Sequence, residues 1–217
     1  MTRHARLFHR AILSVPALAF ALGIAGPVWA AAPQLATTTC SACHGVDGNS
    51  TDGQYPKLAG QKAGYLRLQL EAFRSGARPS AVMKPFAQSL TDAQIAELAR
   101  YYSANREAPE KEPVAPDARR GAAIFRTGGG TGAACATCHA TGGFGGGMMG
   151  GGMMGGGMMR TNPAVTPFLF AQHATYLAQQ LDAFASGARP STVMGPFATQ
   201  LSPDDRKAVA DYLASVR

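Results

Sequence analysis

The sequence is poor in the residues that cross-link chains or bind metals. Its 217 residues include four cysteines, five histidines and one tryptophan. All four cysteines fall in two short motifs, which leaves none for a disulfide framework. After residue 30 no apolar stretch reaches the ~20 residues that a membrane-spanning helix needs. The sequence therefore predicts neither a disulfide-stapled scaffold nor, beyond its first segment, a membrane protein.

The first 30 residues have the pattern of a secretory signal peptide. Three arginines within the first ten residues precede an apolar run at 11–26, and small residues stand at Val28 and Ala30. This order predicts cleavage after Ala30. The alternative is a retained membrane anchor, but the run is short and Pro16 interrupts it.

Removal of residues 1–30 changes the charge balance. Lysine plus arginine falls from 20 to 17 while aspartate plus glutamate stays at 13, so the net charge falls from +7 to +4. Such a weak excess gives no reason to expect nucleic acid as a partner. We expect a protein without a membrane span in an exported, periplasmic compartment.

The sequence C-x-x-C-H occurs twice, at 40–44 and 135–139. It is the attachment signal of a c-type haem, because two thiols on one helical turn reach the two vinyl groups of one porphyrin. The histidine that follows then lies beneath the ring and ligates the iron. We predict two covalently bound haem c groups, held by Cys40, Cys43, Cys135 and Cys138, with His44 and His139 as iron ligands.

Two other interpretations of a C-x-x-C pair are weaker. A dithiol redox motif is expected in a βαβ setting, and no strand-rich segment flanks either copy. Paired zinc-binding units usually lie about 15–20 residues apart. Here 91 residues separate Cys43 from Cys135, and no further ligands are evident.

The chain after the leader is an internal repeat. Residues 75–90 and 186–201 are identical at 12 of 16 positions, at an offset of 111. The two C-x-x-C-H motifs are offset by only 95, so the second half carries 16 extra residues. Duplication of one haem domain is the simplest explanation.

Helical patterns fill both halves. Leu66, Leu70 and Phe73 share one helix face, and Gly76 is placed to end that helix. Thr91 begins the helix that closes the first half. In the second half Ser202 and Pro203 start the equivalent helix, and 117–127 is predicted as an additional one.

The sixth iron ligand follows from exclusion. Apart from His44 and His139, only His173 remains after the leader, at the polar start of a helix where we expect an ordinary surface residue. Met83 and Met194 occupy equivalent positions of the repeat. We predict that they complete His/Met coordination, which saturates the iron and suits electron transfer.

Four further residues are candidates to support the haems. The carbonyl groups of Pro56 and Pro167 could accept the proton of each ligating imidazole, although a plain turn is the alternative. Arg78 and Arg189 could pair with haem propionates, or belong to a solvated face.

With these motifs in place, the chain resembles the diheme class I cytochromes c of the cytochrome c4 type. The resemblance rests on C-x-x-C-H-G-x-D-G-N at 40–49, Pro-x-Leu-Ala-Gly-Gln at 56–61, Tyr-Leu-x-x-Gln-Leu at 65–70 and the Met83 loop. It implies an all-α fold of two tandem cytochrome c domains, one haem in each. It also implies a shuttle from a quinol-oxidising complex or dehydrogenase to a terminal oxidase or reductase. The predicted boundaries are 1–30 signal peptide, 31–106 first domain, 107–116 linker and 117–217 second domain.

A Gly/Met-rich insert at 142–160 departs from this family pattern. A flexible loop is the expected interpretation. Six thioethers also suit Cu(I), and one of them could compete with Met194 for the second iron.

Three function classes follow. The leading hypothesis is an electron carrier without chemistry of its own. The alternatives are a peroxidase or the haem subunit of a periplasmic dehydrogenase complex, and a copper-handling protein. A peroxidase needs an open iron position and a distal acid–base group, for which the sequence offers no spare histidine.

Overall fold

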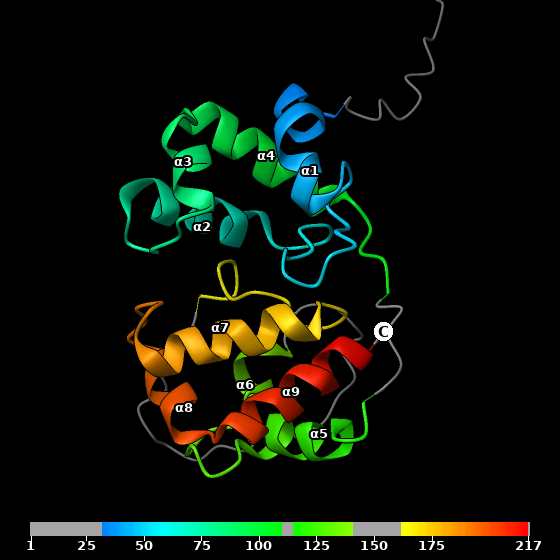
Figure 1. The fold of residues 1–217 in the computed structure, drawn as a ribbon, viewed down its shortest axis with the longest axis vertical. Helices are drawn as coiled ribbons and strands as arrows, with labels where there is room; N and C mark the ends of the chain where they lie inside the picture. The colour runs from blue at the N-terminus through cyan, green and yellow to red at the C-terminus, as the bar shows by residue number, and fades with distance from the viewer. Residues whose placement is uncertain (1–31, 110–114, 141–161, 217) are drawn as a thin grey trace, which may run out of the picture. The chain divides into compact units, whose positions relative to one another are not determined.

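A computed structural model describes residues 32–109, 115–140 and 162–216. Within these ranges every regular element is a helix (Figure 1). The predicted signal peptide at 1–30 and the Gly/Met-rich insert at 142–160 lie outside the described residues. None of the described helices is long and apolar enough to cross a membrane.

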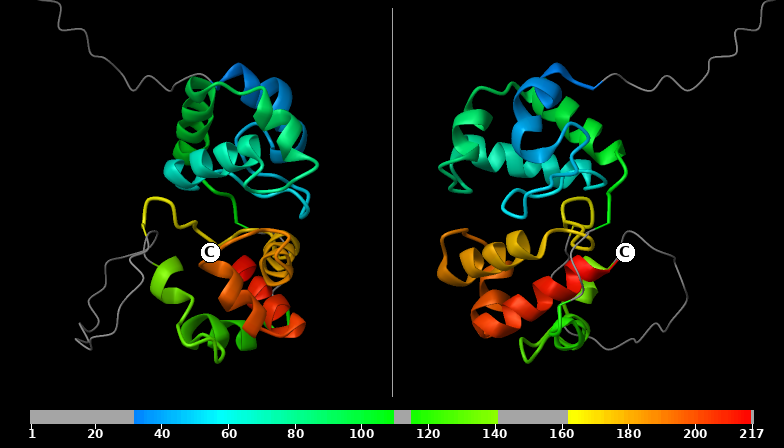
Figure 2. Two further views of the ribbon diagram at one scale, coloured as in Figure 1. Left: turned by 90° about the vertical axis from the view of Figure 1, so that its left-hand side faces the viewer. Right: turned by 45° about the vertical axis from the view of Figure 1, so that its right-hand side comes forward.

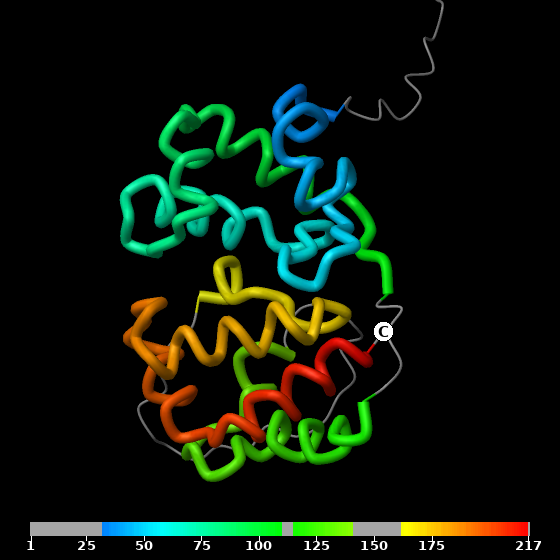
Figure 3. The backbone as a smooth tube through the Cα atoms, viewed as in Figure 1, coloured from blue at the N-terminus to red at the C-terminus, as the bar shows by residue number. Residues whose placement is uncertain are grey.

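The first half begins with a π-helical turn that runs directly into the first C-x-x-C-H motif. Three longer helices follow, joined by short connections that the backbone trace makes visible (Figure 3). In chain order the elements are η1 (Ala36–Cys40), α1 (Ser41–His44), α2 (Ala63–Ser75), α3 (Met83–Gln88) and α4 (Asp92–Ala104).

The second half starts with a helix of its own before the second motif. Its elements are α5 (Ala118–Thr127), α6 (Ala136–His139), α7 (Ala174–Ser186), α8 (Met194–Gln200) and α9 (Pro203–Ser215). Helix α5 lies against α9, as both views of Figure 2 show. The additional helix predicted at 117–127 is thereby confirmed.

The repeat is reproduced in the helices. Helices α2 and α4 recur as α7 and α9 with both ends displaced by 111 residues, and α3 and α8 both begin at the methionine of their loop. Helix α2 ends at Gly76 in the left-handed region, as its sequence predicts. Helix α4 has the predicted capping box at Thr91, and Ser202 caps α9 by accepting from the Asp205 amide.

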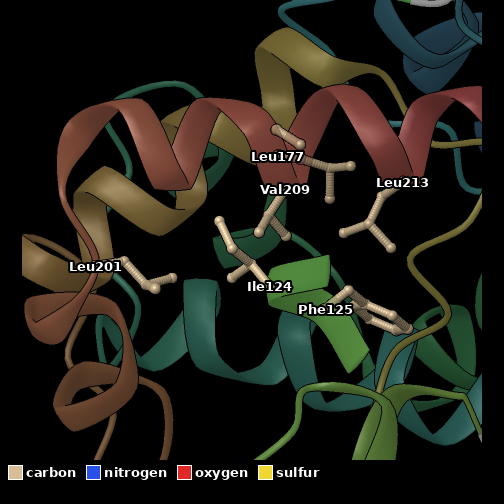
Figure 4. Close-up of a cluster of buried hydrophobic side chains, with 7 residues drawn as sticks. Ile124, Phe125, Leu177, Leu201, Val209 and Leu213 are labelled. Carbon is tan, nitrogen blue, oxygen red and sulfur yellow. The ribbon is translucent and has the colours of Figure 1, made fainter. Parts of the chain in front are cut away.

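Each half has its own apolar cluster. In the first half Leu66 of α2 packs with Leu98 and Tyr102 of α4. In the second half Ile124 and Phe125 of α5 face Val209 and Leu213 of α9, with Leu177 of α7 beside them (Figure 4). Buried apolar surface of this kind is the main stabilising contribution to each helical layer.

The contact of α5 with α9 depends on a glycine. A Cβ placed on Gly121 would lie 1.8 Å from the carbonyl oxygen of Ala208, closer than any non-bonded contact allows. The two helix backbones therefore meet at Gly121, which allows the close packing of α5 on α9.

Candidate haem sites

The first cavity joins the first motif to Met83. It has a volume of about 450 Å³ and is lined by Cys40, Cys43, His44 and Met83 among mainly apolar neighbours. Volumes of about 300–1,000 Å³ are usual for sites that enclose a small molecule or cofactor. The structure thus brings together the residues that the sequence singled out in the first half.

His44 is oriented by the backbone of the loop that follows it. Its Nδ1 lies 2.9 Å from the carbonyl oxygen of Pro56. Because a carbonyl oxygen can only accept, Nδ1 carries the proton, and Nε2 is left unprotonated for a metal. Burial lowers the pKa of His44, which favours the neutral form that ligation requires.

The second cavity repeats this arrangement. It measures about 420 Å³ and is lined by Cys135, His139 and Met194. The Nδ1 atom of His139 lies 3.1 Å from the carbonyl oxygen of Pro167. Burial lowers the pKa of His139, and the nearby Lys62 charge lowers it further. The predicted roles of Pro56 and Pro167 as acceptors are confirmed.

The cysteines lie on short helical turns beside the cavities. None of the four forms a disulfide, and burial raises the pKa of the Cys40 and Cys135 thiols. Each thiol pair begins at the residue before α1 or α6 and ends within that helix, directly ahead of the histidine. This is the geometry that two thioether bonds to one porphyrin need.

One buried polar side chain of the first cavity bears on whether the lining fits a haem. The Tyr102 hydroxyl is buried and has no nitrogen or oxygen partner among the described residues, so the Cys40 thiol is the group it interacts with there. Tyr102 lines the first cavity. Buried hydroxyls are normally paired. Together with the apolar walls and the two histidines, this fits a haem, which when bound supplies the one-electron chemistry.

Two glutamines that the sequence analysis did not single out join the halves. The Gln172 side chain accepts from the Lys57 amide and donates to the Lys57 carbonyl, both at 2.9 Å. Gln61 does the same for Phe168, again at 2.9 Å in each direction. Each glutamine thus holds the residue after the proline that orients the other half's histidine. Their equal offset of 111 was the signal that could have revealed them.

Arg78 and Arg189 also cross between the halves rather than forming a solvated face. Arg78 donates to Gln69 at 2.6 Å and to Gln180 at 2.7 Å. Arg189 donates to Gln180 and Gln69, both at 2.8 Å. Each guanidinium also reaches a tyrosine hydroxyl of the opposite half, Tyr176 or Tyr65.

The surface position predicted for His173 is wrong. Its side chain is only 6% exposed. The Nε2 atom lies 2.8 Å from Ser50 Oγ and 3.1 Å from the Ser50 carbonyl oxygen. Because that carbonyl can only accept, Nε2 carries a proton and is engaged with the first half. The polar helix start that suggested exposure is covered by the other half of the chain.

Comparison with protein families identifies both halves. Residues 29–103 match the family model described as "Cytochrome c". Residues 116–213 match the model described as "Cytochrome C oxidase, cbb3-type, subunit III". Both matches contain one C-x-x-C-H motif each.

Curated relatives cover nearly the whole chain. Cytochrome c4 of Pseudomonas aeruginosa is 34% identical over 195 residues, which span 85% of this chain and 87% of that protein. A protein of Stutzerimonas stutzeri named "Thiosulfate dehydrogenase electron acceptor" is 36% identical over 199 residues, covering 83% and 80%.

A solved structure gives the same result for the fold. Reduced recombinant cytochrome c4 from Pseudomonas stutzeri matches with a TM-score of 0.69 and 32% identity, covering 83% of this chain and 94% of that one. With two cytochrome c domains, two haem c attachment motifs and these relatives, the chain belongs to the cytochrome c4 family of diheme electron-transfer cytochromes, which are electron carriers rather than enzymes.

Proposed function

We propose that the two haems are bound and ligated by the eight residues that the sequence predicts. Cys40 and Cys43 carry the first haem, and His44 and Met83 ligate its iron. The corresponding residues for the second haem are Cys135, Cys138, His139 and Met194. The observation that carries this proposal is that each cavity is lined by one motif histidine and one loop methionine.

Arg78 and Arg189 are the proposed partners of the haem carboxylates. Both arginines line both cavities. Within the described residues neither guanidinium has an acidic partner, and two glutamine oxygens accept from both. Two partly buried positive charges without an acid need a counter-charge, which the propionate carboxylates of haems bound in the two cavities would supply.

The protein acts as a periplasmic shuttle in this proposal. Residues 1–30 are the signal peptide, cleaved after Ala30, and the domains are 31–106 and 117–217 with a linker at 107–116. Electrons come from a quinol-oxidising complex or a dehydrogenase and pass to a terminal oxidase or reductase. The relative named as an electron acceptor of thiosulfate dehydrogenase favours a dehydrogenase as donor.

A second candidate is a haem subunit held permanently in a periplasmic dehydrogenase complex. The observation in its favour is a solved thiosulfate dehydrogenase from Marichromatium purpuratum, "TsdBA", which matches with a TM-score of 0.65 and 33% identity. This chain covers only 36% of that one. Size-exclusion chromatography of the native protein distinguishes the two hypotheses. A carrier should elute alone, whereas a subunit should elute together with its enzyme.

The ligand assignment is tested by optical spectroscopy of the holoprotein. We expect the weak near-infrared sulfur-to-iron band of His/Met ferric haem from both sites. Met83→Ala should remove it from one haem only and lower that haem's potential, and Met194→Ala should do the same for the other. A full band in either variant would remove that methionine from its site.

The copper alternative concerns the insert at 142–160, which lies outside the described residues. Among the described residues no cluster of histidine, cysteine, aspartate or glutamate is arranged to hold a metal ion. The prediction is a flexible loop without tight copper binding, and Cu(I) titration of the reduced protein tests it against the copper alternative.

A further inference from the structure

A closed set of hydrogen bonds joins two arginines and two glutamines of the two halves. The side-chain oxygen of Gln69 accepts from Arg78 at 2.6 Å and from Arg189 at 2.8 Å. The side-chain oxygen of Gln180 accepts from the same two guanidiniums, at 2.7 Å and 2.8 Å. We call these four residues the arginine–glutamine ring. Each glutamine in it holds both arginines, so neither guanidinium can move without breaking a bond to each glutamine.

An aromatic side chain supports each guanidinium from one side. The guanidinium carbon of Arg78 lies 4.5 Å from the centre of the Phe73 phenyl group, and that of Arg189 lies 4.5 Å from the centre of Phe184. The face of an aromatic group attracts a cation placed over it. The glutamines hold the edges of the two guanidiniums and the phenylalanines hold their faces, which fixes both charges in position.

The ring follows the internal repeat. Gln69 and Arg78 recur as Gln180 and Arg189, each displaced by 111 residues. Each guanidinium donates through Nη1 to the glutamine of its own half and through Nη2 to the glutamine of the other. The two arginines have the same surroundings, so nothing in the arrangement assigns either of them to one half alone.

The ring is also a wall that the two cavities share. All four of its residues line both cavities. By contrast, His44 and Met83 line only the first cavity, and His139 and Met194 line only the second. A group bound in either cavity therefore lies next to the same pair of positive charges.

The glutamines hold together two charges that repel each other. Both guanidiniums are partly buried, and within the described residues neither has an acidic partner. Partial burial weakens screening by water, and neutral amide oxygens offset only part of the repulsion. If a glutamine is lost, we expect the two guanidiniums to separate and to turn toward water.

We propose that the two glutamines of the ring are positioning residues for electron transfer, because they hold both arginines as one pair of charges that acts on both haems. The inference rests on the proposed function, since it requires haems in the two cavities. A ferric haem carries one more positive charge than a ferrous one, so a cation held nearby favours the reduced state. At an effective dielectric constant of about 20, a unit charge about 10 Å away shifts such an equilibrium roughly tenfold.

The test is a redox titration of holoprotein carrying Gln180→Met, at pH 7. Methionine keeps the length of the side chain and removes the acceptor oxygen. The haems are followed separately by the NMR signals of their ferric methyl groups, assigned with Met83→Ala. Each guanidinium loses one of its two glutamine partners, so the ferric-to-ferrous ratio at the wild-type midpoint should rise about threefold for both haems, a part of the effect of a whole charge. Gln69→Met should give the same result from the other half.

Two further variants serve as references. Gln179→Met is the matched control, because Gln179 is exposed, precedes Gln180 and lines only the first cavity. It should leave both ratios within about 1.5-fold of the wild type. Arg78→Gln removes one charge of the pair and should raise the ratio about tenfold for both haems. If Gln180→Met does not take up both haems, Gln69→Met decides the question.

The outcomes are distinct. A purely structural role of the glutamines would lower the free energy of unfolding and leave both midpoints in place. Ratios within about 1.5-fold of the wild type, a shift confined to one haem, or a shift toward the reduced state would each overturn the proposal. Unchanged midpoints in Arg78→Gln would instead contradict the arginines as haem partners, and absence of the sulfur-to-iron bands from the wild-type protein would contradict the ligand assignment.

Discussion

The two halves of the chain build the same site with different supporting residues. In both halves a proline carbonyl accepts from the motif histidine. In both, a glutamine of the other half pairs with the backbone N–H and C=O of the residue after that proline. Where the first half has the buried Lys57, the second has Phe168. The comparison teaches that duplication kept the histidine and methionine that line each cavity and left their surroundings free to differ.

The largest expected effect falls on the second half alone. Gly121→Ala places a methyl group into the Ala208 carbonyl, so α5 must separate from α9 at a cost of about 3 kcal/mol or more. Thermal unfolding followed by the sulfur-to-iron band of each haem should show that the second haem loses its methionine ligation at the lower temperature. The control is Gly195→Ala in α8, where a Cβ would lie 3.9 Å from the nearest atom. Equal stability of both variants would contradict the close helix contact.

The next effect compares the two glutamines. Gln172→Ala leaves two buried backbone groups of Lys57 without a partner, whereas the groups freed by Gln61→Ala are only partly buried. We expect a loss of about 3 kcal/mol for Gln172→Ala and about 2 kcal/mol for Gln61→Ala. Denaturant unfolding of the holoproteins measures both. The control is Gln88→Ala at an exposed position, which should change the free energy of unfolding by less than about 0.5 kcal/mol. Losses as small as that of the control would show that the two glutamines do not stabilise the contact between the halves.

A smaller effect depends on pH. Burial raises the pKa of Glu107 to about 7 from an ordinary 4.5, so the folded state binds this proton more tightly than the unfolded chain. The free energy of unfolding then falls as pH rises from about 4.5 to about 7. Glu107→Gln should be more stable than wild type by about 1 kcal/mol at pH 8, after allowance for solvent screening, and equal to it at pH 4. A constant difference across this range would show that the carboxyl does not titrate there.

The smallest effect concerns one backbone position. Gly60 and Ala171 are equivalent in the repeat, and both have positive φ, 69° and 56°. A side chain in this region costs about 1–2 kcal/mol. Ala171→Gly should raise stability by about 0.5 kcal/mol once the lost methyl burial is counted, and Gly60→Ala should lower it by about 1 kcal/mol. Thermal melts of the pair check the signs; the opposite order would contradict the conformational argument.

Local patterns in the sequence predicted much of this structure. The capping box at Thr91, the glycine that ends α2 and the methionines at the repeat offset are signals written within a few residues. The proline carbonyls were also predictable, since each follows its histidine at a place equivalent in the two halves.

Contacts between the halves were not predictable in this way. The position of His173 was predicted wrongly because the polar start of its helix is covered by Ser50, 123 residues earlier in the chain. Lysine is usually a surface residue, yet Lys57 is buried with its ammonium against the carbonyl groups of Ala108 and Ala171 from distant segments. Periodicity describes one element at a time, so it cannot report which residues of a distant segment cover it.

The paired glutamines make the molecule resemble an obligate heterodimer carried on one chain. A fragment cut at the linker would expose the backbone groups of residue 57 or 168 that the missing half now satisfies. The first fragment would also lose the Ala171 carbonyl from its buried ammonium. A single-haem protein engineered from either half would therefore need new polar partners on the exposed face before it could stand alone.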